Sequence, residues 1–237
     1  MLIDVFQRYL SAYDLVEQLA VMSHEAPVSL LDVGANGPGF AAFNHFAAVE
    51  QVNIDISSVP KEVRSRYPQV RFSTYSGKGL PFSDGFFDVV ICVDVLEHVP
   101  PDQRAAFILD VIRVSKEYVI FTFPVKTSEN WERFLSQITF GRIRFLQEHL
   151  KNGLPSDSDF TDAISTAKTA SIQSESGNLN LWLWIPLKLF SSICSRLFKN
   201  KDELTFRSFL FYRRHLSRYL NFGRCYSKTY VLRKTLR

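Results

Sequence analysis

Residues 27–39 read PVSLLDVGANGPG, a short apolar run that passes directly into a turn with three glycines. Such a run is typical of a strand that is buried on both faces of a parallel sheet. Glycines after the strand let the backbone turn sharply and approach a ligand closely. We therefore predict a strand over 27–33 that ends in a ligand-binding turn.

Strands and helices alternate on both sides of this stretch. No hairpin signal separates the strands, so they predict a doubly wound α/β sheet with right-handed crossovers. The other strands expected in this half are 51–56, 70–75, 86–93 and 117–123. The expected helices are 4–22, 40–50, 60–67 and 102–114.

The second half of the chain has weaker patterns. A helix is expected over 128–140, a turn over 152–159, a strand near 169–174 and a last strand over 225–233 that need not be parallel. No convincing boundary divides the chain, so 1–237 is predicted to be one domain. Its expected parts are a core over 27–125, a helical substrate or lid region over 126–224, and the last strand.

Residues 181–198, LWLWIPLKLFSSICSRLF, are more apolar than a surface helix requires. The segment is too short and too interrupted to span a membrane comfortably. We interpret it as a helical lid over the substrate cleft. The alternative is a helix that lies in a membrane interface.

The net charge of +4 hides an asymmetry along the chain. Residues 204–237 contain nine of the 28 Lys and Arg and none of the 24 Asp and Glu, so the rest of the chain carries 19 − 24 = −5. This basic region is either a solvated surface or a face for an anionic partner, which would be a phosphate-bearing substrate or a membrane surface. With three dispersed cysteines and no export signal, the chain is expected to be cytoplasmic, with peripheral contact at the inner face of the membrane as an alternative.

In an open α/β sheet, ligands bind beyond the carboxyl ends of the strands. Asp32 and Gly34 leave the first strand there, and the glycines follow a G-x-x-G-x-G spacing rather than the G-x-G-x-x-G of dinucleotide-binding proteins. This spacing argues against a nicotinamide oxidoreductase. An acid two residues before the first glycine suits a ligand with an ammonium group.

Asp55 ends the second strand, where a carboxylate can accept hydrogen bonds from both hydroxyls of a ribose. Further along, LPFSDGFFD (80–88) precedes the fourth strand and VLEHVP (95–100) follows it.

Taken in order, these segments resemble the class I S-adenosylmethionine-dependent methyltransferases, over about residues 27–125. The resemblance is closest to members that act on small molecules, quinones, lipids and sugars. It implies a seven-stranded, Rossmann-like, mostly parallel sheet, with a helical lid inserted near the C-terminus. It also implies S-adenosyl-L-methionine as the cofactor.

Carried over by position, the resemblance implies a set of cofactor contacts. The methionine portion would meet Asp32, Gly34 and Asp94 and the loop of Asn36, Gly37 and Gly39, the ribose would meet Asp55, and the adenine would meet Ile56 and Leu80. The chain departs from the family at two places. Asn36 replaces the second glycine, and Ser76 stands where an acid usually binds the adenine amino group.

His98 is the candidate catalytic residue, as the base for a hydroxyl acceptor. The alternative is that His98 and Glu97 only hold their loop. Asp94, Glu97 and His98 also resemble the Glu-x-x-Glu-His of metal-dependent relatives, so a Mg²⁺ site on these three residues is a further alternative.

The sequence thus predicts a methyltransferase that O-methylates a small or lipid-linked, glycan-type acceptor. The alternative is a methyltransferase-like partner subunit without turnover. Peripheral contact with an anionic membrane through the basic C-terminal region is a further alternative. Nucleic acid is not an expected partner.

Overall fold

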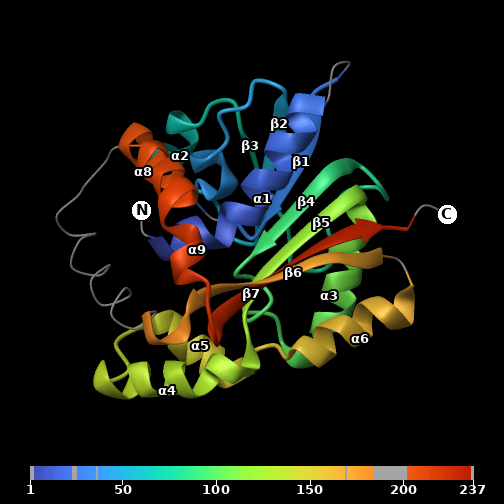
Figure 1. Ribbon diagram of the computed structural model, residues 1–237. Coiled ribbons are helices and arrows are strands. Elements are labelled where there is room, and N and C mark those ends of the chain that lie inside the picture. The colour runs from blue at the N-terminus through green and yellow to red at the C-terminus, as the bar shows by residue number, and fades with distance from the viewer. Residues whose placement is uncertain (1–2, 23–25, 36, 169, 184–201, 236–237) are drawn as a thin grey trace.

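The computed structural model describes residues 3–22, 26–35, 37–168, 170–183 and 202–235 (Figure 1). The strands are β1 (Val28–Val33), β2 (Val49–Asp55), β3 (Arg71–Thr74), β4 (Phe87–Val93), β5 (Ser115–Pro124), β6 (Ala170–Asn180) and β7 (Cys225–Lys234). The helices are α1 (Ile3–Met22), α2 (Lys61–Arg66), α3 (Pro101–Val114), α4 (Glu129–Ile138), α5 (Arg144–Asn152), α6 (Asp157–Ala167), α8 (Asp202–His215) and α9 (Ser217–Leu220). Two 3₁₀ turns, η1 (Gly39–Ala42) and η2 (Lys126–Ser128), complete them.

All seven strands form one sheet in the order β3-β2-β1-β4-β5-β7-β6. β1 to β5 pair in parallel, whereas β7 is antiparallel to both of its neighbours. Strand order reverses between β1 and β4, where the chain has gone outward to β3 and returned. The predicted Rossmann-like, mostly parallel sheet is therefore confirmed.

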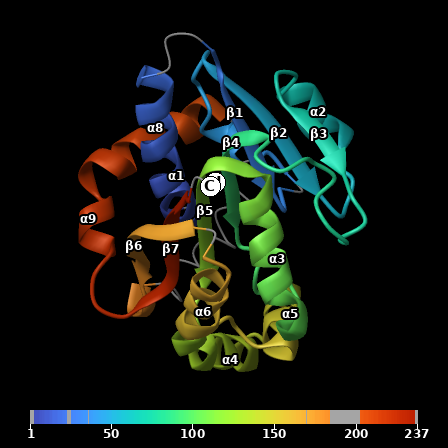
Figure 2. The same ribbon diagram turned by 90° about the vertical axis from the view of Figure 1, so that its right-hand side faces the viewer.

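Two hydrophobic clusters cover the two faces of this sheet, and adjacent strand residues divide between them. Leu31 packs with α3 and α6 on one face, whereas Leu30 packs with α1 and α8 on the other. The same division holds for Val89 and Val90 of β4. Figure 2 shows the resulting three layers, with the sheet between the two pairs of helices.

The expected helix over 40–50 is wrong. Only Gly39–Ala42 is helical, as the 3₁₀ turn η1. The side chain of Asn44 ends it, because its oxygen accepts a hydrogen bond from the Phe46 amide at 3.2 Å and its amide donates to Gln51 at 3.0 Å. A side chain that binds nearby backbone in this way competes with helix formation.

Residues 152–159 are only in part the turn that the sequence predicts. The bend lies between α5 and α6, and α6 already begins at Asp157. Ser156 caps this helix, since its hydroxyl accepts a hydrogen bond from the Asp159 amide at 3.0 Å. Together with α4, helix α5 lies beyond the carboxyl ends of β4 and β5 (Figure 1).

Helix α8 packs on α1. Its Phe209 and Tyr212 are buried among Phe6, Tyr13 and Phe43. Arg213 forms ion pairs with Asp14 at 2.7 Å and with Glu17 at 2.6 Å, so the basic region finds acidic partners that its own sequence lacks. Within the described residues, no helix combines the length and the apolar character needed to cross a membrane. Most of the segment interpreted as a lid, 184–198, lies outside the described residues.

Candidate functional site

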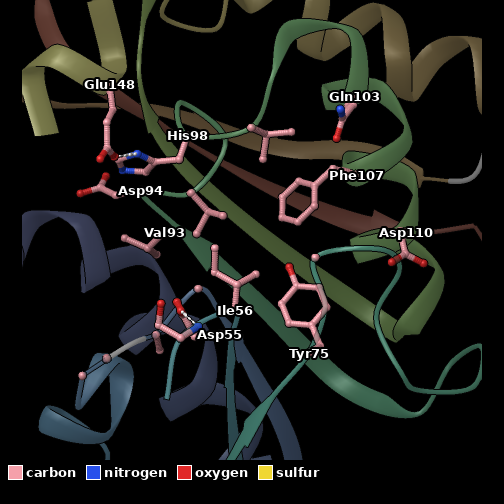
Figure 3. Close-up of a pocket in the computed structure, with 18 of the residues that line it drawn as sticks. Asp55, Ile56, Tyr75, Val93, Asp94, His98, Gln103, Phe107, Asp110 and Glu148 are labelled. Atoms are coloured by element: carbon pink, nitrogen blue, oxygen red, sulfur yellow. Dashed lines mark hydrogen bonds and ion pairs between the residues drawn. The ribbon is translucent and has the colours of Figure 1, made fainter. Parts of the chain in front are cut away.

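A cavity of about 1140 Å³ opens at the carboxyl ends of β1, β2 and β4, beside the point where strand order reverses. Residues of α1, of the glycine turn, of the segments after β2, β3 and β4, and of α3 and α5 line it. Figure 3 shows Asp55 and Ile56 at one end of this pocket and Asp94, His98 and Glu148 at the other. A site at this place matches the expectation for an open α/β sheet.

The turn after β1 requires glycine at two positions, because neighbouring side chains leave no room for a Cβ there. Gly34 has φ +82°, and a Cβ there would lie 2.2 Å from Cγ2 of Val95. At Gly39, with φ +54°, a Cβ would lie 2.3 Å from Oδ2 of Asp32. Gly37 has open space around it and lines the pocket, whereas Asn36 lies outside the described residues.

Asp32 lies beneath this turn and does not line the pocket. Its Oδ2 accepts a hydrogen bond from the Phe40 amide at 2.7 Å, and its side chain is 1% exposed. Among the described residues, Oδ1 has no hydrogen-bond partner. Burial raises the pKa of this carboxyl to about 7, although the bond from Phe40 acts in the opposite direction.

Asp55 and Ile56 line the pocket directly after β2. One oxygen of Asp55 accepts a hydrogen bond from the Ser57 amide at 2.7 Å, which fixes the carboxylate at the strand end. Ile56 is 68% exposed, which is high for an apolar side chain, and Tyr75 lies near it in the pocket (Figure 3). Leu80, by contrast, is buried in the core and is not part of the lining.

Asp94 follows β4 and adopts φ +54°, a conformation that is uncommon outside glycine. Its Oδ2 forms an ion pair with Arg8 of α1, while no described residue hydrogen-bonds to its buried Oδ1. Both residues line the pocket, so a carboxylate and a guanidinium face the same space.

His98 stands at the same end of the pocket, with its Nδ1 3.2 Å from Oε2 of Glu148 (Figure 3). Its side chain is 39% exposed, and its ring lies edge to face with that of His149, with centroids 4.9 Å apart. Partial burial, followed by the His149 charge, lowers the pKa of His98, and the Glu148 carboxylate opposes this effect.

The structure also shows which residues could hold a metal ion. In the part of the chain that is described, Glu97, His98 and His149 each offer a ligand atom, and these atoms all lie within 4.8 Å of one another. Asp94 is not in this group, because it is paired with Arg8.

Sequence reasoning missed several residues of the pocket. Tyr75 follows β3 at the carboxyl edge of the sheet, so the strand-end rule that found Asp55 could have found it. Arg8 and Glu148 gave no signal, since they reach the pocket from distant helices that only the tertiary fold brings there.

Residues 31–123 match the family model described as "Methyltransferase domain". This segment is similar to a methyltransferase domain. The match begins within β1 and ends within β5, so it contains the glycine turn, Asp55, Asp94 and His98. The predicted resemblance to class I S-adenosylmethionine-dependent methyltransferases is confirmed.

Solved structures resemble the matched segment together with the rest of the chain. Magnesium protoporphyrin IX methyltransferase from Synechocystis, with bound S-adenosylhomocysteine (SAH), is 16% identical, with a TM-score of 0.54 and coverage of 97% of this chain and 86% of that one. The plantazolicin methyltransferase BpumL, in complex with an analogue and SAH, is 14% identical, with a TM-score of 0.61 and coverage of 98% and 85%. A protein from Pyrococcus horikoshii is 16% identical, with a TM-score of 0.55 and coverage of 97% and 92%. These structures share the fold, and no curated protein sequence matches the chain.

Proposed function

We propose that the protein transfers the methyl group of S-adenosylmethionine to a hydroxyl of a small or lipid-linked, glycan-type acceptor. The observation that carries this proposal is the single pocket in which Asp55 and Ile56 stand at one end and Asp94 and His98 at the other. The cofactor has a matching order of groups, with adenosine at one end and the amino acid at the other. Two similar proteins hold SAH, the product of such a transfer.

Each part of the cofactor has a chemical counterpart in the pocket. The free oxygen of Asp55 is suited to the ribose hydroxyls, and Ile56 with Tyr75 offers an apolar place for adenine. Arg8 and Asp94 supply a cation and an anion for the carboxylate and the ammonium of the methionine portion. Asp32 would act indirectly, by holding the glycine turn through the Phe40 amide.

The chemistry demands little of the protein beyond alignment. Methyl transfer from a sulfonium is an in-line displacement, so the protein must orient the acceptor, exclude water and remove the hydroxyl proton. His98 is proposed to accept that proton, since it lies at the open end of the pocket with Glu148 behind its ring.

We also propose that the surface of α8, α9 and the following turn contacts an anionic membrane. Phe211 and Tyr219 are each 59% exposed and Phe222 is 56% exposed, and Arg214 and Arg218 lie exposed on the same helices. Exposed aromatic and basic side chains together suit a membrane interface. A lipid-linked acceptor would be presented from such a surface.

The test separates binding from transfer. Calorimetry should detect SAH binding to the purified chain, and labelled S-adenosylmethionine should transfer its methyl group to a component of a panel of hydroxyl-bearing metabolites and lipid extracts. His98→Ala should then lower turnover by about 10²–10⁴-fold without changing SAH affinity. Binding without any transfer would favour the partner subunit instead, and absence of SAH binding would contradict the proposal altogether.

A further inference from the structure

Two buried side chains beside the acceptor end of the pocket have polar atoms without hydrogen-bond partners. Glu97 is 1% exposed and His149 is 3% exposed. Among the described residues, nothing hydrogen-bonds to Oε2 of Glu97 or to Nε2 of His149. Buried polar atoms in folded proteins are nearly always paired, so each unpaired atom requires an explanation.

The two side chains are near each other without being bonded. Nε2 of His149 lies 4.0 Å from Oε1 of Glu97, which is too far for a hydrogen bond. This separation leaves room for an atom that would contact both. His98 closes the same space, because its ligand atom lies within 4.8 Å of the other two and its ring is open to the pocket.

The opposite side of the His149 ring is held firmly. Its Nδ1 lies 2.9 Å from Oε1 and 3.1 Å from Oε2 of the buried Glu132, which also accepts a hydrogen bond from the hydroxyl of Tyr226. A histidine that binds a metal usually donates its other ring N–H to a carboxylate, which fixes both the tautomer and the direction of the ligand nitrogen. Here Nδ1 of His149 faces Glu132, so Nε2 is directed toward Glu97 and His98.

From these contacts we infer that Glu97, His98 and His149 bind a divalent transition-metal ion of the zinc type. Two imidazoles and one carboxylate are the donors that Zn²⁺ and similar ions prefer, whereas Mg²⁺ prefers oxygen. The His149 ring lies between two buried acidic side chains, Glu97 and Glu132, which face it from its two sides. The site differs from the set expected from the sequence, since His149 of α5 takes the place of Asp94.

The geometry requires only a small closure. Tetrahedral zinc with bonds of about 2.0–2.2 Å places its ligand atoms about 3.4 Å apart, so no pair of these atoms has to approach by more than about 1.4 Å. His98 can supply this movement, because it is the exposed member of the three. Three protein ligands leave a fourth position, and it would face the pocket.

An open position suits a catalytic rather than a purely structural ion. In this respect the inference rests on the proposed function. A hydroxyl acceptor bound at the fourth position would lose its proton more readily, and His98 would then serve as a ligand rather than as the proton acceptor. The nearby Glu148 carboxylate, 3.2 Å from Nδ1 of His98, is placed to take up that proton.

The experiment measures zinc binding directly. An untagged chain freed of metal with a chelator is titrated with Zn²⁺ by calorimetry, and the bound metal is counted after gel filtration. We expect one Zn²⁺ per chain. Glu97→Gln and His98→Ala should each weaken binding by about 100-fold or more, and Glu132→Gln by about 10–100-fold, because it loosens the His149 ring. His215→Ala removes an exposed imidazole on α8 and should leave zinc binding unchanged.

His98→Ala is the decisive variant, because the residue is exposed and its loss should not impair folding. Absence of stoichiometric binding by the unmodified chain would overturn the inference, as would zinc affinity that is unchanged in both His98→Ala and Glu97→Gln. SAH binding is measured on the same samples. Zinc binding without SAH binding would sustain this site and contradict the proposed methyltransferase activity, and the reverse result would do the opposite.

Discussion

The carboxyl group of Asp32 is buried, and it holds the backbone of the glycine turn through a hydrogen bond. Its hydrogen bond from Phe40 positions η1 against the end of β1. Gly39 is required for this contact, because any side chain there would collide with Oδ2. The raised pKa of Asp32 therefore follows from its structural task.

Asp32 should make the stability of the ligand-free protein depend on pH. A carboxyl whose pKa is higher in the folded than in the unfolded chain stabilises the fold at low pH and loses that contribution as the pH rises to the folded value, here about 7. Between pH 5 and pH 8 this group should reduce the free energy of unfolding by about 2–3 kcal/mol. Asp32→Asn should remove that part of the dependence in urea titrations. Parallel curves for the two proteins would contradict the prediction.

Asp55 tests the adenosine end of the pocket. Asp55→Ala should weaken SAH binding by about 2–4 kcal/mol in calorimetry, since two ribose hydroxyls would lose a charged acceptor. Asp55→Asn should lose less, because its amide oxygen can still accept from the Ser57 amide. Glu50→Ala, an exposed change near the opposite end of β2, is the matched control and should have no effect. Equal affinity in folded Asp55→Ala would remove this residue from the site.

Gly34 sets the distance between the turn after β1 and the segment after β4, because the absence of a side chain lets Val95 pack against this turn. Gly34→Ala should destabilise the fold by about 2 kcal/mol or more, from its positive φ and from the 2.2 Å contact with Val95. The double variant with Val95→Ala should recover part of the loss. A double-mutant cycle in urea with no coupling between the two changes would show that the contact has no energetic effect.

The sequence correctly predicted those helices and strands whose ends are set by residues within the same segment, such as prolines. Helix α2 begins directly after Pro60, which is its N-cap, and its last helical residue is Arg66, as expected for a helix that must end before Pro68. The helix over 40–50 failed because Asn44 binds Gln51 and the Phe46 amide, which apolar spacing does not reveal. His149 could not be linked to His98 either, since 50 residues, which include the whole of β5, separate them.

The contact between α1 and α8 joins segments that lie far apart in the sequence, and Phe209 is at its centre. Phe209→Ala should cost about 3–5 kcal/mol of unfolding free energy, because the ring is fully buried between Phe6, Tyr13 and Phe43. Phe211→Ala, on the same helix but 59% exposed, should change stability by less than about 0.5 kcal/mol. Similar melting temperatures for the two variants would show that α8 is only loosely attached.

At the scale of the whole molecule, basic side chains are concentrated near the C-terminal end of the sequence and acidic ones in the rest. The fold brings some of these opposite charges into contact. Arg213 pairs with acids of α1, so its replacement would disturb the fold as well as the surface. Arg214→Gln with Arg218→Gln is the cleaner variant. It should weaken binding to anionic vesicles by about 1 kcal/mol per charge and leave SAH binding unchanged.

The control removes the same charge elsewhere, through the exposed Lys61→Gln and Lys151→Gln. Sedimentation with phosphatidylserine vesicles measures the difference, and neutral phosphatidylcholine vesicles report any contribution of the aromatic side chains alone. If the two double variants sediment equally with these vesicles, the basic face does not bind the membrane and is only a solvated surface.

The position of β7 in the sheet also affects how the nascent chain folds during synthesis. β7 follows β6 in the chain but lies between β5 and β6 in the sheet. A nascent chain that has not yet reached residue 225 therefore has an unpaired edge on β5, and β6 cannot be held in place by the strand that joins it to the sheet. Open strand edges can pair with other chains, so the nascent chain is exposed to aggregation in the interval between the synthesis of β6 and that of β7. A ribosome that stalls shortly before β7 would prolong this stage, and chaperones that act on nascent chains would then matter most.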